Sequence, residues 1–254
     1  MLPWGRKKVS STVKLVPRLR RRVRSLIRDV IGYDVQKSGP GQDAYADIQR
    51  LIGSSTRSPN IFDIGANVGQ TVDVLLGLFP LANIHAFEPG RAAFNSLTAT
   101  HSQLRNVTLN NFALGSDPGK QPFFANSASV LSSFLPLGPD GWGEITERPE
   151  VSISTVDTYC SEHGIQLLDL LKVDTQGFEL EILKGSKRML NERRIRLIYL
   201  EIMFSKAYEN LPRMDKTYGF LADHGFDLYA FYKFHFLHDR ASWTDALFVR
   251  SQEA

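Results

Sequence analysis

Short apolar runs alternate with helix-like segments from residue 60 onward, and this alternation constrains the fold more than any other feature of the chain. The expected strands are 60–64, 83–87, 107–114, 122–125, 151–154, 168–173, 196–202, 227–234 and 246–250. The expected helices are 70–79, 91–103, 156–163, 178–190 and 211–224, with a short one at 43–51. This order predicts an α/β fold with a mostly parallel sheet and helices on both faces. Right-handed crossovers then bring the carboxyl ends of the strands to one edge, where ligands bind.

The charged residues divide the chain into two parts. Residues 1–28 hold ten of the 30 Lys and Arg residues and none of the 27 Asp and Glu residues, which leaves a formal charge of −7 on residues 29–254. We therefore expect a basic helical arm and linker at 1–54 and a globular domain at 55–254. An acidic domain is poorly suited to a nucleic-acid backbone, so a small molecule or glycan is the expected partner. The oligomeric state is left open.

The arm has the pattern of a basic amphipathic helix over residues 12–31, where apolar residues recur at spacings of three and four among arginines. Three roles are open for it: packing on the domain, which we favour, contact with an anionic membrane, or contact with nucleic acid. We expect no membrane-spanning helix, since no apolar run reaches about 18 residues.

Cysteine usage points to a reducing compartment. Cys160 is the only cysteine, which excludes an intramolecular disulfide and a Cys-based metal site. No apolar stretch follows the basic N-terminal residues, so a secretory signal is not expected. We expect a cytoplasmic protein, with peripheral contact at the membrane through residues 12–31 as the alternative.

The strongest local motif is Asp63-x-Gly65-x-Asn67-x-Gly69, which joins the strand at 60–64 to the helix at 70–79. Glycines allow the backbone to turn tightly and to approach a ligand, and a helix start offers free N–H groups and partial positive charge. A ligand with a nucleoside and a carboxylate fits such a turn. The spacing is not the dinucleotide G-x-G-x-x-G, and no P-loop lysine follows. The alternative is a Gly-rich turn without a ligand.

Glu88 is the second signal, because it ends the next strand and follows Gly69 by 19 residues. An acidic residue at about this distance commonly bonds a pair of ribose hydroxyls. The alternative is a carboxylate that caps the following helix. With the first motif present, ribose binding is the favoured interpretation.

The chain resembles the FkbM-type methyltransferases over about residues 55–250, in four motifs that occur in the family's order. They are Asp63-x-Gly65-x-Asn67-x-Gly69, His85-Ala-Phe-Glu88-Pro89, Asn111-Phe-Ala113-Leu-Gly115 and Asp174-Thr-Gln-Gly177-Phe-Glu179. The resemblance implies a Rossmann-like class I fold, with a seven-stranded sheet whose last strand is antiparallel. It also implies S-adenosyl-L-methionine as methyl donor and O-methylation of a sugar, glycolipid or secondary metabolite.

By position, the resemblance assigns the donor-binding residues. They are Asp63, Gly65, Asn67 and Gly69 around the methionine half, Thr71 at its carboxylate, Glu88 at the ribose, and Phe112, Ala113 and Leu114 at the adenine. The chain departs from the family at Gln176, where relatives usually have Glu. If that Glu is a base or a metal ligand elsewhere, this chain lacks the function or supplies it through Asp174 or Glu179. No clear metal-ligand set is evident, so no metal ligand is assigned, and a divalent metal that joins Asp174 to a second carboxylate is left open.

Catalysis of O-methylation needs alignment of the acceptor and a base for its hydroxyl proton. Asp174, at the end of the strand at 168–173, is the first candidate, with Glu179 nearby, and His235 in an aromatic cluster is the next. The alternative for that cluster is packing, with a solvated histidine. The Ser-rich segment 127–137 closes over the site or is a plain surface loop. Lys172 is expected to support the structure by pairing with a buried carboxylate such as Glu201.

Two other classes of function were weighed. An RNA or protein methyltransferase is disfavoured, because Asp174 is followed by Thr-Gln-Gly and not by the Pro-Pro-aromatic element that holds exocyclic nitrogens. A non-catalytic module that kept the fold is disfavoured by the intact Gly65, Gly69 and Glu88.

Overall fold

The computed structural model describes residues 23, 25–26, 29–30, 39–53 and 56–251. The helix expected at 12–31 falls largely outside these residues, so its role stays a prediction. Pro40–Ala254 forms one compact unit. The first helix in it, α2 (Ala44–Ile52), buries Ile48 and Ile52 completely, so the core of the unit begins before residue 54.

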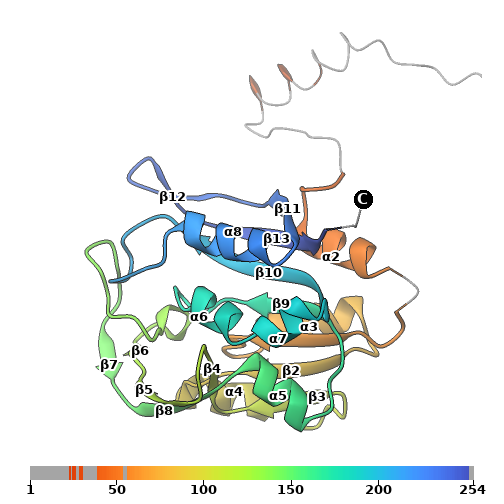
Figure 1. Cartoon of the computed structure of the whole chain (residues 1–254). Helices are drawn as coiled ribbons and strands as arrows, with labels where there is room; N and C mark the ends of the chain where they lie inside the picture. The colour runs from red at the N-terminus through yellow and green to blue at the C-terminus, as the bar shows by residue number, and fades with distance from the viewer. Residues whose placement is uncertain (1–22, 24, 27–28, 31–38, 54–55, 252–254) are drawn as a thin grey trace, which may run out of the picture. The chain divides into compact units, whose positions relative to one another are not determined.

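A central sheet forms the middle layer of this unit (Figure 1). In spatial order its strands are β11 (Phe226–Phe231), β13 (Arg240–Arg250), β10 (Ile195–Met203), β9 (Leu168–Val173), β1 (Asn60–Ile64), β2 (Asn83–Phe87) and β3 (Val107–Asn110). A further short strand, β12 (His235–Leu237), also pairs with β13. β13 runs antiparallel to its neighbours and the β10–β9–β1–β2–β3 pairs are parallel, as the sequence predicted.

Helices cover both faces of the sheet (Figure 1). They are α2, α3 (Gln70–Leu78), α4 (Arg91–His101), α5 (Val156–Glu162), α6 (Glu179–Lys184), α7 (Lys187–Asn191) and α8 (Met214–Asp223). Side-chain caps fix where two of them begin: Asp43 accepts a hydrogen bond from the Ala46 N–H at α2, and Thr155 accepts one from the Thr158 N–H at α5. Such caps satisfy backbone donors that a helix start leaves free.

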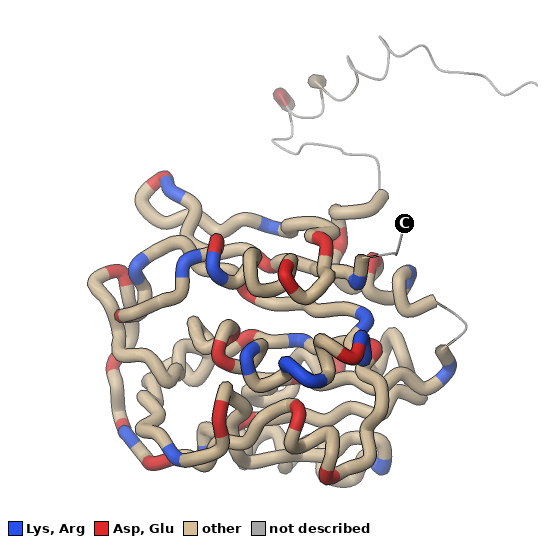
Figure 2. The backbone as a smooth tube through the Cα atoms, in the orientation of Figure 1, with Lys and Arg blue, Asp and Glu red and all other residues tan. Residues whose placement is uncertain are grey.

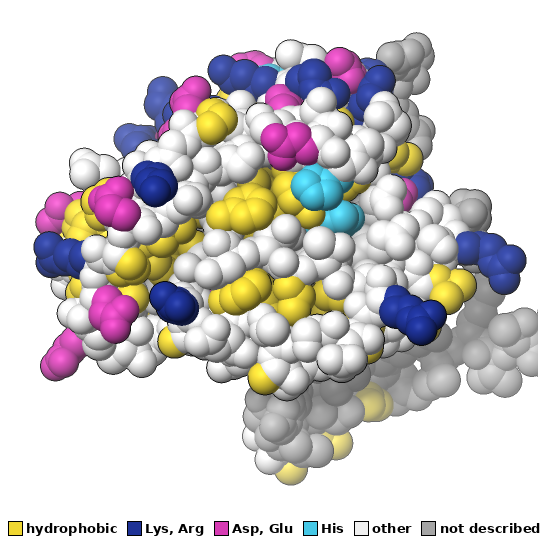
Figure 3. Space-filling view, turned by 90° about the horizontal axis from the view of Figure 1, so that it is seen from below, with side chains coloured by type: hydrophobic (Ala, Val, Ile, Leu, Met, Phe, Trp, Pro, Cys, Tyr) yellow, Lys and Arg dark blue, Asp and Glu magenta, His cyan; other side chains and the backbone are white. Residues whose placement is uncertain are grey.

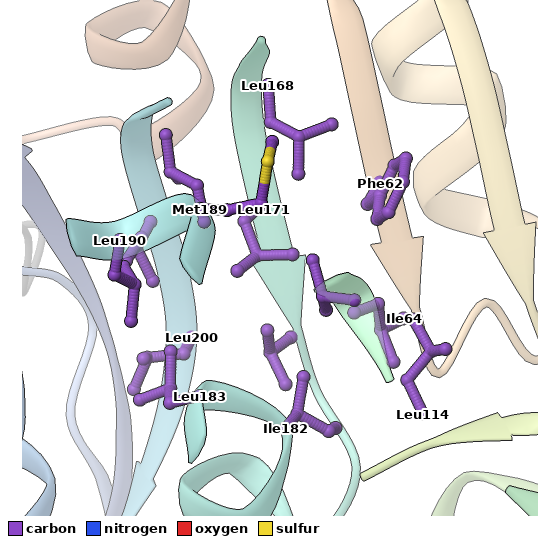
Figure 4. Close-up of a cluster of buried hydrophobic side chains, with 14 of the residues drawn as sticks. Phe62, Ile64, Leu114, Leu168, Leu171, Ile182, Leu183, Met189, Leu190 and Leu200 are labelled. Carbon is purple, nitrogen blue, oxygen red and sulfur yellow. The ribbon is translucent and has the colours of Figure 1, made fainter. Parts of the chain in front are cut away.

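The alternation of side chains along the strands produces two hydrophobic clusters, one on each face of the sheet. Phe62 and Leu171 belong to the cluster under α6 and α7, part of which Figure 4 shows. Ile61 and Leu170, their neighbours in the chain, belong to the cluster under α2 and α3. All six residues of β9 are buried, which is expected of a parallel strand that is covered on both sides.

Two expected elements are divided in the structure. The strand expected at 107–114 ends at Asn110, and Ala113–Leu114 (β4) pairs in a separate sheet with β8 (Glu150–Ser154), beside β5 (Gly119–Pro122). The side chains of Asn110 and Asn111 donate to the Ala86 and Glu88 carbonyls, and such bonds to the backbone compete with a ladder. The helix expected at 178–190 is divided at Gly185, where a Cβ would lie 1.9 Å from the Gly115 carbonyl oxygen.

The surface of the unit has no single-signed track along its described backbone, because acidic and basic residues are interspersed (Figure 2). Figure 3 shows one face with small apolar patches between polar side chains and charged side chains near its edges. In the described part of the chain, no helix combines the length and the apolar composition that crossing a membrane requires.

Candidate active site

A pocket lies at the carboxyl ends of β1, β2 and β9, where the sequence placed the ligand site. Its empty space is about 710 Å³ including the open mouth, which is in the usual range for small-molecule pockets. The walls of this first pocket include Gly65, Asn67, Thr71, Glu88, Ala113, Leu114 and Asp174. Seven residues predicted from motifs far apart in the sequence therefore converge on one space.

The turn between β1 and α3 depends on glycine for packing against its neighbours. Gly65 has φ +78°, and a Cβ there would lie 1.9 Å from the Asp174 carbonyl oxygen. Gly69 has φ +100° and caps α3, and its Cβ would lie 2.4 Å from His101 Cε1. Gly69 does not line the pocket. Its role is to let α3 and α4 approach closely, so that the N-terminus of α3 faces the pocket.

Asn67 joins this turn to two other parts of the site. It has φ +48°, a left-handed conformation that asparagine tolerates better than most residues. Its N–H donates to Glu88 Oε2 at 2.9 Å, and its Oδ1 accepts from Ser129 Oγ at 2.9 Å. The residue therefore links the β1–α3 turn to the end of β2 and to the Ser-rich segment.

Glu88 is held at the pocket by backbone donors. Oε1 accepts from the Gly90 N–H at 2.7 Å and Oε2 from the Asn67 N–H at 2.9 Å. Only 6% of the residue is exposed, and burial raises the pKa of Glu88 to about 7 although both N–H groups act to lower it. Each carboxylate oxygen has further acceptor capacity, so hydroxyl groups of a ligand can bond to it.

An ion pair lies beneath the pocket. Lys172 Nζ is 2.8 Å from Asp63 Oδ1 and also donates to the Gly65 carbonyl at 3.1 Å. Burial alone would lower the pKa of Lys172, but the Asp63 and Asp174 carboxylates outweigh it and the pKa is raised. Lys172 thus pairs with a buried carboxylate, as predicted, but the partner is Asp63, which lies opposite it in register on β1, and not Glu201. Asp63 itself is fully buried and does not line the pocket.

The predicted adenine-side residues are only partly brought together. Ala113 and Leu114 line the pocket from β4, whereas Phe112 packs against Phe87 and Tyr159 in the core. Two aromatic residues that the sequence analysis missed, Phe123 and Phe134, line the pocket instead, with ring centroids 5.1 Å apart. Their positions follow from the small β4–β8–β5 sheet, which the apolar periodicity did not reveal.

The Ser-rich segment lies over the first pocket. Ser129 bonds Asn67 as described, Ser133 Oγ donates to the Gln176 carbonyl at 2.8 Å, and Val130 forms part of the wall. Short polar side chains therefore tie this segment to two loops at the carboxyl edge of the sheet.

Asp174 stands where the first pocket meets a second one. The second pocket, with empty space of about 870 Å³ including its mouth, is lined by Asp174, Glu201, Tyr208, Trp142 and Trp243 among others. The Asp174 side chain is 46% exposed, and its Oδ2 lies 4.0 Å from Lys172 Nζ. A carboxylate in this position can reach ligands in both pockets.

Gln176 connects Asp174 to Glu201. Its Nε2 donates to Asp174 Oδ1 at 3.2 Å and to Glu201 Oε2 at 2.9 Å, and the Tyr208 hydroxyl lies 3.0 Å from its Oε1. Burial, then the charge of Asp174, raises the pKa of Glu201 well above its ordinary value. The sequence marked Gln176 as a departure from the family but did not reveal that its amide bridges two carboxylates.

Glu179 and His235 do not reach either of these pockets. Glu179 Oε1 accepts from the Thr175 N–H, the Thr175 hydroxyl and the Gly177 N–H, so the residue closes the loop that carries Asp174. The His235 ring stacks on Trp243, with centroids 4.5 Å apart and an interplanar angle of 4°. The geometry gives both residues supporting positions, not positions beside a reacting atom.

The strand order, the antiparallel β13 and a pocket at the β1–α3 turn define the Rossmann-like fold of class I methyltransferases. A crystal structure described as methyltransferase FkbM from Methylobacillus flagellatus has this fold, with a TM-score of 0.51 and 16% identity over 82% of this chain. This chain spans about half the length of that protein, 48%. The sequence pattern described as Methyltransferase FkbM domain matches residues 63–228, so the chain belongs to that family.

Two relatives of this chain are named for their activities. The 2-O-methyltransferase NoeI of Sinorhizobium fredii is 28% identical over 175 residues, which are 64% of this chain and 71% of NoeI. The hexuronic acid methyltransferase AglP of Haloferax volcanii is 23% identical over 157 residues, which are 61% of this chain and 60% of AglP. The family resemblance predicted from the sequence is thereby confirmed.

Proposed function

We propose that this protein transfers a methyl group from S-adenosyl-L-methionine to a hydroxyl oxygen of a sugar, glycolipid or secondary metabolite. The observation that carries the proposal is the first pocket, where the start of α3, the Glu88 carboxylate and the Asp174 carboxylate face one space. The names of NoeI and AglP support an oxygen acceptor on a sugar-like compound.

The residues of the first pocket fit the donor chemically. Glu88 has acceptor capacity for two ribose hydroxyls, and the α3 N-terminus, with the Thr71 side chain in the wall, suits the amino-acid carboxylate. Ala113, Leu114 and Phe134 offer apolar surface for a base. When bound, the donor would supply a methyl group on a positively charged sulfur, so that attack by an oxygen nucleophile forms the O–CH₃ bond, breaks the S–CH₃ bond and releases a neutral thioether.

Asp174 is the proposed proton acceptor. An alcohol is a weak nucleophile until its proton is removed, so a carboxylate beside it contributes to the rate. Asp174 is oriented by the Gln176 amide and stands between the two pockets, where the acceptor oxygen must meet the methyl group.

Isothermal calorimetry with S-adenosylhomocysteine and S-adenosylmethionine tests the proposal. We expect micromolar dissociation constants for the full chain and a loss of affinity in the Glu88→Gln variant. If neither compound binds at millimolar concentration, the first pocket is not a donor site and the proposed function is refuted. Methyl transfer to total RNA but to no glycoside or glycolipid would overturn the proposed acceptor class.

A further inference from the structure

The second pocket adjoins the first at Asp174, Gln176 and Val130, which line both. A molecule in the second pocket therefore lies next to the only residue that the proposed function uses as a base. No motif predicted this pocket, and its walls come from β10, β13, the segment between β6 (Ala125–Asn126) and β7 (Ile145–Glu147), and the chain after β10.

All charges in the wall of the second pocket are negative. Asp140, Asp174 and Glu201 line it, and its lining contains no Lys, Arg or His. Asp140 stays in place because its Oδ2 accepts from the Lys206 N–H at 2.9 Å. An anionic ligand would meet carboxyl groups and no cation in the lining, since Lys172, 4.0 Å from Asp174, is paired with the buried Asp63 and does not line this pocket. Such an encounter is unfavourable in a partly enclosed site.

The remaining wall suits a ring that carries hydroxyl groups. Trp142 and Trp243 meet edge to face, with centroids 6.0 Å apart, and Trp142 is 48% exposed. His235 fixes the Trp243 ring by stacking on it. Ser242 and Ser205, joined by a 2.9 Å hydrogen bond, supply polar atoms in the same wall. Aromatic faces contact the C–H faces of sugars, while carboxylates and hydroxyls accept from sugar hydroxyls.

We propose that the second pocket binds the methyl acceptor as an uncharged, hydroxyl-bearing ring and discriminates against acceptors that carry a carboxylate or a phosphate. The proposal rests on the proposed function, because it identifies the second pocket as the acceptor half of that site. It separates this chain from AglP, which is named for a hexuronic acid. Trp142 and Trp243 hold the ring, and the Asp140 and Asp174 carboxylates disfavour an anion.

A matched pair of probes tests this charge preference. p-Nitrophenyl β-D-glucopyranoside and p-nitrophenyl β-D-glucuronide have the same aglycone and differ in one carboxylate. Binding of each to the full chain saturated with S-adenosylhomocysteine would be measured by saturation-transfer NMR, and methyl transfer by radiolabelled S-adenosylmethionine. We expect the neutral glycoside to bind at least tenfold more tightly. Equal or tighter binding of the glucuronide would overturn the proposal.

Two variants locate the binding. Trp142→Ala should weaken binding of the neutral glycoside about tenfold. Asp140→Asn, which removes a charge from the wall and keeps an oxygen acceptor, should narrow the difference in affinity between the two probes. Phe236→Ala is the matched control, since Phe236 is 67% exposed on β12 and does not line the pocket. If Trp142→Ala binds the neutral glycoside as tightly as the wild type does, the glycoside does not bind in the second pocket and the proposal fails.

Calorimetry with the donor distinguishes the two proposals. A chain that binds S-adenosylmethionine but neither glycoside retains the proposed donor site and refutes the acceptor proposal. A chain that binds no donor refutes both.

Discussion

Replacement of Glu88 by Gln gives the sharpest test of the donor site, because the structure predicts effects on affinity, on stability and on their dependence on pH. Each carboxylate oxygen now accepts from one backbone N–H, from Gly90 and Asn67. In Glu88→Gln one oxygen becomes an NH₂ group that faces a donor. The variant therefore loses an internal hydrogen bond, one acceptor oxygen for ribose and the negative charge on the other.

The affinity change follows from the ribose bonds. A hydrogen bond to a charged group contributes about 1.5–3 kcal/mol, so loss of one such bond weakens donor binding roughly 10- to 160-fold, and loss of two weakens it further. In the wild type, protonation of Glu88 has a similar effect. Since its pKa is about 7, donor affinity should fall roughly tenfold per pH unit as the pH decreases below 7.

The pH dependence of stability has a definite sign. Burial raises the pKa of Glu88 from 4.5 to about 7 in the folded state, so the folded protein holds this proton more tightly than the unfolded chain. The stabilisation from that proton is complete below pH 4.5 and is lost as the pH rises through 7. At about 1.4 kcal/mol per pH unit it amounts to about 3 kcal/mol.

Calorimetry at pH 5.5, 6.5, 7.5 and 8.5 measures donor affinity, and urea unfolding at the same values measures stability. Glu88→Gln should bind weakly with a nearly flat pH profile, whereas the exposed control Glu162→Gln should follow the wild type. If Glu88→Gln keeps both the affinity and the pH profile of the wild type, Glu88 neither holds the ribose nor titrates near 7, and the reasoning fails.

Three further substitutions test the groups around the pockets. Lys172→Met should lower the free energy of unfolding, measured by urea denaturation, by about 3–5 kcal/mol, because it leaves the Asp63 carboxylate buried without its partner. The double variant with Asp63→Asn should regain part of the loss. An effect of the single variant below about 1 kcal/mol would contradict the ion pair. Asp174→Asn should reduce methyl transfer to the neutral glycoside about 100- to 10,000-fold, while donor affinity in calorimetry changes less than about threefold. Unchanged turnover would show that Asp174 is not the base. Gln176→Glu would place a third carboxylate beside Asp174 and Glu201, and it should lower the free energy of unfolding at pH 8 by about 1–3 kcal/mol. At pH 5 part of the loss should be recovered, because the two neighbouring carboxyl groups favour the protonated form of the new one. Equal decreases in melting temperature at both pH values would refute the bridging role.

The prediction from sequence succeeded best where one stretch of chain carries its whole signal. The strands at 60–64, 83–87 and 168–173 have the predicted bounds, because each is a short, mainly apolar run that ends at a polar or glycine-containing turn. The strand predicted at 107–114 is too long, because apolar residues resume at Phe112–Leu114 and extend the apparent run. In the structure the ladder ends where the Asn110 and Asn111 side chains donate to backbone carbonyls.

For the candidate site, too, the sequence predicted best the residues whose signal lies within one short motif. Gly65, Asn67 and Glu88 were predicted from spacing, since the carboxyl ends of parallel strands meet at one edge regardless of side-chain detail. The positions of His235 and Glu179 depend on how a hairpin and a loop fold back, and neither residue lines the two pockets. Gln176 looked like the loss of a function, whereas in space its amide joins Asp174 to Glu201.

The amino-acid sequence by itself determined the layered α/β fold, the edge of the sheet that holds the pocket and the family, because periodicity and turn motifs are properties of short segments. Tertiary structure decided which charges pair, which carboxylates face a ligand and that a second, acidic and aromatic pocket opens beside Asp174. Pairing and burial depend on distances between residues that are far apart in the chain, such as Asp63 and Lys172, and only the packed sheet sets those distances.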